Sequence, residues 1–181
     1  QTLDILKATP LGGRQIALGE LITPTVIMTG VLLWLLWTAT LCFLLTGGSA
    51  AFTPPMIGAA AVGLALLVPP LCALMLSVPF AGSVYFPAWL APEKGASRGV
   101  EVMGQRMIFM AGYILALMIA LLPAVLLAGL VFLLVNWLVG MVPAILLTAP
   151  CAAVVLGLEL RLVLGVLGRR IDAFDLSQEL R

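Results

Sequence analysis

The sequence contains no histidine, and its 181 residues include only three cysteines. Without histidine, the chain cannot build a histidine general base, a Ser-His-Asp triad or a histidine-ligated metal site. Cys42, Cys72 and Cys151 each lie within an apolar run, and none belongs to a CxxC pair. This spacing supports neither a disulfide framework nor a zinc site. We therefore expect no metal or other cofactor, and we interpret the cysteines as small buried hydrophobic side chains.

Charge is also scarce, because only 9% of the residues are charged whereas 63% are hydrophobic. A soluble domain normally carries about 25% charged residues. No water-soluble fold of this length could bury so much apolar surface, so the composition indicates one membrane domain in contact with the lipid bilayer.

Three further classes of function are disfavoured by missing patterns. The Lys and Arg residues are scattered near the ends of apolar runs and form no basic face, so we expect no binding to nucleic acid. There is no GxxxxGK[ST] motif, so we expect that this chain does not hydrolyse nucleotides by itself. Paired acids or a Ser-Lys pair at membrane depth are also absent, so an intramembrane enzyme is the weakest of the alternatives.

What the sequence has in abundance is long uncharged apolar runs. At about 1.5 Å per residue, each is long enough to cross a hydrocarbon core of about 30 Å. The fold class that we predict is all-α, a polytopic transmembrane helical bundle with four spans. The predicted spans are residues 21–46, 56–78, 107–135 and 141–160.

The segments between and beside these spans complete the predicted organisation. Residues 1–20 are expected to form a cytoplasmic interfacial helix and a lead-in, with a new helix starting near Arg14 after Pro10 and two glycines. Residues 79–106 form a cytoplasmic loop that includes an amphipathic helix over 97–106, which we place along the membrane surface. Residues 161–181 form a cytoplasmic tail.

Individual residues in the spans carry more specific expectations. Trp34 and Trp37 lie too deep for an interfacial belt, so we expect them to pack against neighbouring helices. Pro69 and Pro70 should kink or break the second span. Small residues let helices approach closely, and we expect this of Ala59, Ala61, Gly63 and Ala65 in the second span. Near the end of the fourth span, Gly157, Gly165 and Gly168 either weaken the helix or let it pack tightly.

The distribution of positive charge predicts the orientation. The two short connectors that follow the first and third spans contain no charged residue. All nine Lys and Arg residues fall on the side that the two termini share with residues 79–106, which is the positive-inside pattern. Both termini and the central loop are therefore predicted to be cytoplasmic.

Three charged residues lie close to the membrane edge, namely Glu20, Glu159 and Arg161. Ionisable residues at membrane depth are candidates for function. Near the edge, however, they can also snorkel to water, so a structural salt bridge or an anchoring role is the alternative.

Three stretches resemble a known family. Residues 3–20, LDILKATPLGGRQIALGE, resemble the segment that precedes a span in permease subunits of type-two ABC exporters. The FPAW stretch at 86–89 with RGVEVMGQR at 98–106 resembles the central loop of these exporters, and LGRRIDAFD resembles their carboxyl tail. Since such permeases normally have more than four spans, the resemblance implies that this chain is the carboxyl-terminal part of a longer protein.

The resemblance also implies a function and partners. It implies an integral subunit in the cytoplasmic membrane of a prokaryote that works with a separate ATP-binding subunit, and a dimer of permease subunits is compatible with it. Short cytoplasmic helices would transmit nucleotide-driven closure to the spans. The candidate coupling residues are Glu93, Lys94, Arg98, Glu101 and Arg106, followed by Lys7 and Arg14. Two alternatives stay open: the loop is only an interfacial connector, or the protein is a membrane scaffold that does not transport.

Overall fold

The computed structural model describes residues 13–46, 52–85 and 100–172. Within 100–106 it describes the exposure of Gly104 alone, and the side chain of Asp172 lies outside the described set. The described residues form helices and contain no strand. There are four helices, and in chain order they are α2 (Gly13–Leu45), α3 (Pro54–Tyr85), α5 (Val100–Val139) and α6 (Met141–Asp172). All four are long and apolar enough to cross a membrane, so the predicted all-α bundle of four spans is confirmed.

The helices are longer than a membrane crossing requires. They contain 33, 32, 40 and 32 residues, which at 1.5 Å per residue is roughly 48–60 Å, against a hydrocarbon core of about 30 Å. The extra turns lie largely where the sequence predicted loop or tail: α3 continues through Tyr85 and α6 through Asp172. Likewise, Val100 begins a helix that runs without interruption into the third span, so residues 100–106 do not form a separate helix.

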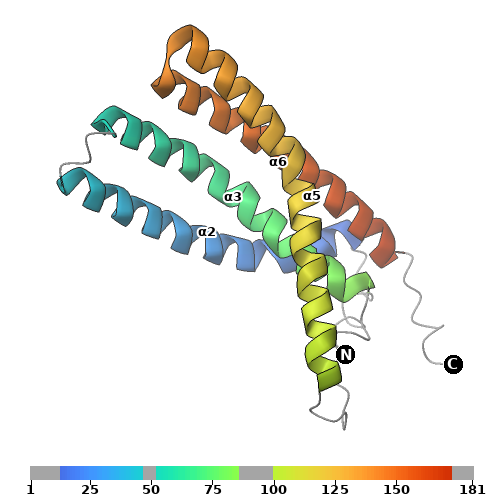
Figure 1. The fold of residues 1–181 in the computed structure, drawn as a ribbon. Coiled ribbons are helices and arrows are strands. Elements are labelled where there is room, and N and C mark those ends of the chain that lie inside the picture. The colour runs from blue at the N-terminus through green and yellow to red at the C-terminus, as the bar shows by residue number, and fades with distance from the viewer. Residues whose placement is uncertain (1–12, 47–51, 86–99, 173–181) are drawn as a thin grey trace, which may run out of the picture.

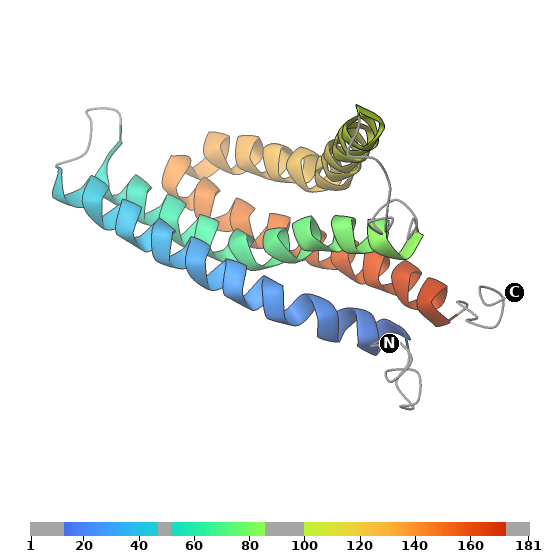
Figure 2. The same cartoon turned by 90° about the horizontal axis from the view of Figure 1, so that it is seen from below.

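The helices form two antiparallel hairpins, α2–α3 and α5–α6, and α6 contacts each of the other three helices. In Figures 1 and 2, α3 lies between α2 and α6, and the second half of α5 lies along α6. The ends that join α2 to α3 and α5 to α6 point to one side of the bundle. The start of α2, the end of α3, the start of α5 and the end of α6 point to the other side (Figure 1).

Prolines inside the helices have different effects. In α3, the backbone stays helical through Pro69, Pro70 and Pro79, so the pair at 69–70 does not break the second span. In α5, which contains Pro123, the axis changes direction near the middle of the helix (Figures 1 and 2). A proline removes one helical hydrogen bond and its ring crowds the carbonyl four residues earlier, which bends the helix. The first half of α5 consequently diverges from α6.

Two small clusters of buried side chains hold the bundle together. In the first, Ala17 and Leu21 of α2 pack against Leu164 of α6, with Leu76 and Phe80 of α3 beside them. In the second, Leu74 of α3, Ala124 of α5 and Leu156 of α6 are buried together. The first cluster therefore joins α2, α3 and α6, and the second joins α3, α5 and α6.

The small residues of α3 are placed as predicted, whereas the aromatic residues of α2 are not. Ala59, Ala61 and Gly63 are buried and Ala65 is partly buried, and a Cβ atom at Gly63 would lie 3.2 Å from the Cβ atom of Ala149 in α6. In contrast, Trp34 and Trp37 are 68% and 51% exposed, so the prediction that they pack against neighbouring helices is wrong for the described bundle.

The cysteines follow the prediction only in part. Cys72 is buried and Cys151 is partly buried, but Cys42 is exposed on α2, so its predicted burial is wrong. The physical reason is the same as for the two tryptophans. A lipid-facing side chain can be as apolar as a buried one, so hydrophobicity does not identify the face of a membrane helix that packs.

Candidate functional site

The described charged side chains lie towards the end of the bundle where α2 begins and α6 ends. They belong to two helices and are Arg14, Glu20, Glu159, Arg161, Arg169 and Arg170. We call this the charged end. It is also the end where α3 stops at Tyr85 and α5 starts at Val100. The sequence predicted that the Lys and Arg residues lie on one side of the membrane. In the fold, the described charges lie towards one end of the bundle.

At the charged end, α2 and α6 are in backbone contact. A Cβ atom built on Gly168 of α6 would lie 2.9 Å from the backbone nitrogen and the Cα atom of Arg14. Only a residue without a side chain allows this approach, because real Cβ contacts are longer. Arg14, one of the predicted coupling residues, is thereby fixed against the last turns of α6.

A second contact joins α3 to α6 at the same level. The guanidinium carbon of Arg170 lies 5.7 Å from the centre of the Tyr85 ring, which is within the range of a cation–π interaction. The neighbouring Arg169 donates from Nε to the carbonyl oxygen of Gly165 at 3.3 Å. Positive side chains in the last turn also complement the negative end of the helix dipole. Three of the four helices are therefore linked at the charged end.

The three predicted membrane-edge charges have different environments. Glu20 and Arg161 are exposed. Both carboxylate oxygens of Glu159, in contrast, are buried and have no hydrogen-bond partner among the described residues. Residues two apart on a helix do not face each other, which explains why Glu159 does not pair with Arg161.

Glu159 is on the side of α6 that packs against α3 and α5. Its helical neighbours Leu156, three residues earlier, and Val163, four residues later, both belong to the second cluster. The same cluster contains Leu71 and Leu74 of α3 and Ala120, Leu121 and Ala124 of α5. The carboxylate is therefore enclosed where three helices meet, close to the turn of α5 that holds Pro123.

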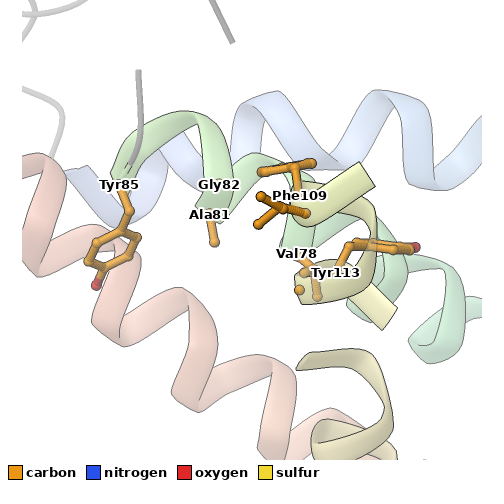
Figure 3. A pocket seen from close by; sticks show the side chains of 8 residues that line it. Val78, Ala81, Gly82, Tyr85, Phe109 and Tyr113 are labelled. Carbon is orange, nitrogen blue, oxygen red and sulfur yellow. The ribbon is translucent and has the colours of Figure 1, made fainter. Parts of the chain in front are cut away.

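A groove of about 340 Å³ lies between α3 and the diverging first half of α5. Its walls come from both helices and are formed by Val78, Ala81, Gly82, Tyr85, Ile108, Phe109, Gly112 and Tyr113. Figure 3 shows Phe109 lying over Gly82 and Tyr85 lying beside α6. A Cβ atom at Gly82 would be 2.7 Å from the Phe109 ring, so the glycine makes room for that ring. We call this the α3–α5 groove.

A second groove of about 330 Å³ lies at the opposite end, among α2, α3 and the start of α6. It is lined by apolar side chains such as Phe43, Phe52 and Met56, together with Thr40. The Thr40 hydroxyl donates to the carbonyl oxygen of Leu36 at 2.7 Å, so it is occupied. This groove offers a ligand apolar contacts and no charged group.

The remaining predicted coupling residues are only partly placed. Glu101 and Arg106 belong to the first turns of α5, but their side chains lie outside the described set. Lys7, Glu93, Lys94 and Arg98 lie outside the described residues. Among the described residues, no three His, Cys, Asp or Glu side chains gather closely enough to hold a metal ion.

The α3–α5 groove and the burial of Glu159 are features that the sequence reasoning missed. The available signal for the groove was a glycine close to an aromatic residue on each helix. Tyr85 follows Gly82 by three positions, and Phe109 precedes Gly112 by three positions. The burial of Glu159 has no comparable signal, because it depends on which face of α6 the other helices cover.

Fold and charge distribution together define the class: an integral membrane protein built from four apolar helices, with its described charges towards one end. No family model, no characterised protein and no solved structure matches the chain.

Proposed function

We propose that this chain is the permease part of an ATP-driven exporter in the cytoplasmic membrane of a prokaryote. It would act with a separate ATP-binding subunit and move substrate across the membrane. The observation that carries the proposal is the contact between Gly168 and the Arg14 backbone at the charged end. A force applied at the start of α2 would pass directly to α6, because no flexible side chain separates the two backbones.

The contact between Arg170 and Tyr85 supports the same function. It extends the linkage from α6 to the end of α3, next to the segment 86–99 that carries the coupling candidates Glu93, Lys94 and Arg98. Closure of an ATP-binding subunit against this end would then move three helices together. Such rigid-body motion around packed helices is a common way to switch the access of a membrane pathway.

The second support is the amount of apolar surface that the four helices leave uncovered. The most apolar stretches of α2 and of the α5 span are 0% and 6% buried. A transport pathway requires more helices around it, supplied by further spans or by a second permease subunit. The same exposed surface would also suit a membrane scaffold that only binds other helices, so the experiment must separate these two functions.

The deciding experiment is co-isolation from native membranes. We expect the full-length protein, tagged and purified in mild detergent, to retain an ATP-binding subunit and to show ATPase activity. Because the chain has no nucleotide-binding motif, this activity must come from the partner. A scaffold would be isolated with membrane proteins but without ATPase activity, and that result would refute the proposed function. The control is the same purification from cells without the tag.

A further inference from the structure

The starting observation is the carboxylate of Glu159, which is buried among helices and lacks a hydrogen-bond partner among the described residues. A carboxylate in a nonpolar interior costs several kcal/mol unless a positive group or donors compensate it. The nearest arginine in sequence, Arg161, is exposed. Within the described part of the chain, the negative charge of Glu159 is therefore not compensated by a hydrogen bond.

The α3–α5 groove begins one helical turn further along α3 than the second cluster. Leu71 and Leu74 belong to the cluster around Glu159, and Val78 and Tyr85 line the groove. These residues recur every three to seven positions along one face of α3, so cluster and groove are consecutive parts of one seam. On α5, Tyr113 lines the groove and Leu121, two turns later, belongs to the cluster.

The groove has the chemistry to hold the apolar part of a cationic molecule. Its volume of about 340 Å³ is within the usual range of about 300–1,000 Å³ for small-molecule sites. Three of its lining side chains are aromatic, namely Tyr85, Phe109 and Tyr113, and aromatic faces attract organic cations. At the Tyr85 end of the groove, the positive charge of Arg170 lies over the Tyr85 ring.

We propose that the seam binds a lipophilic organic cation, with its apolar body in the α3–α5 groove and its positive charge beside Glu159. This inference deepens the proposed function, on which it rests, by naming the substrate class. A cation of this kind can enter the groove from the lipid, because the groove is lined by apolar side chains. The negative charge of the carboxylate then compensates the positive charge of the cation, which has no water around it in the groove.

Equilibrium binding of tetraphenylphosphonium tests the inference. The full-length protein is placed in nanodiscs of uncharged phosphatidylcholine, so that anionic lipid does not bind the probe. We expect saturable binding to the wild type and an affinity at least about tenfold lower for Glu159→Gln, because a desolvated charge pair contributes more than about 1.4 kcal/mol. Glu20→Gln is the matched control, since it removes an exposed carboxylate near the same end, and we expect it to bind as the wild type does.

A second variant tests the groove while leaving Glu159 intact. A Cβ atom at Gly112 meets no atom within 4 Å, so Gly112→Phe can fill the groove without displacing a helix. Gly129→Phe on the same helix is the control, because Gly129 also has open space and does not line the groove. We expect Gly112→Phe to weaken binding and Gly129→Phe to leave it unchanged.

Several outcomes would overturn the inference. One is the absence of saturable binding to the wild type. Another is wild-type affinity in either Glu159→Gln or Gly112→Phe. Binding that depends on Arg170 and requires anionic lipid would show that the groove holds a lipid instead. Co-isolation of the ATP-binding subunit is measured on the same preparations, so failure of the cation site is distinguishable from failure of the proposed exporter function.

Discussion

Gly168 of α6 lies against the backbone of Arg14 of α2, so that a Cβ atom at position 168 would be 2.9 Å from the Arg14 nitrogen, Cα and Cβ atoms. Backbone is a rigid neighbour, so the added methyl group cannot be accommodated by the rotation of a side chain. The two helices must separate, and the adjacent cluster of Ala17, Leu21 and Leu164 would loosen with them. The contact thus connects the stability of the bundle to the charged end.

Replacement of Gly168 by alanine should therefore destabilise the protein by about 1–3 kcal/mol, the usual cost of overpacking. Thermal unfolding in detergent would measure the change, followed in a Cys42→Ser background by the reaction of a thiol-reactive dye with the buried Cys72. Gly165→Ala is the matched control, since a Cβ atom there meets no atom within 4 Å. The control should be neutral or slightly more stable, because alanine favours helix over glycine. Equal melting temperatures for the two variants would contradict the close contact.

Removal of the aromatic ring at Tyr85 should weaken the link between α3 and α6. We expect Tyr85→Leu to lose about 0.5–1 kcal/mol, the value of an exposed cation–π pair. Tyr85→Phe keeps the ring beneath Arg170 and should retain wild-type stability. The same unfolding assay measures both. If phenylalanine and leucine lowered the stability equally, the hydroxyl group rather than the ring face would be responsible.

The sequence allowed prediction of the number of spans, their approximate positions and the gathering of charge on one side. These features depend on local composition and on chain length. Both can be read without knowledge of how the helices pack.

The packing faces could not be predicted in the same way. In α5 nearly every side of the helix is apolar, so periodicity does not distinguish lipid from protein. The same is true of α2, so the sequence did not reveal that Trp34 and Trp37 are exposed. Small residues were the better guide, since Gly63 and Gly168 do mark close contacts, although Gly157 and Gly165 have open space. Burial of Glu159 required the position of α5, which the sequence does not specify.

Labelling of introduced cysteines tests the predicted orientation of the bundle. In a background in which Cys42, Cys72 and Cys151 are replaced by serine, we expect Ser49→Cys to react with a membrane-impermeant maleimide added to intact cells. Ser97→Cys should react only after the membrane is opened, because the positive-inside rule places the loop at 79–106 in the cytoplasm. Protection of position 49 together with labelling of position 97 would reverse the orientation.

A change at the central loop should separate ATP hydrolysis from transport. We expect Arg98→Ala combined with Glu101→Ala to remove the stimulation of ATPase activity by substrate and to lower transport, while the ATP-binding subunit still co-isolates. The physical reason is the loss of the charged contacts through which a soluble subunit can move a membrane helix.

The control for this prediction is Glu20→Gln combined with Arg161→Ala. It also removes two charges of opposite sign, but both are exposed on helices that begin or end at the charged end. Substrate-stimulated ATPase activity and transport are measured together in proteoliposomes that contain the whole complex. Normal coupling in the Arg98 and Glu101 variant would exclude the loop from the mechanism and leave the Arg14–Gly168 contact as the candidate route, because it is the described point where α2 and α6 meet backbone to backbone.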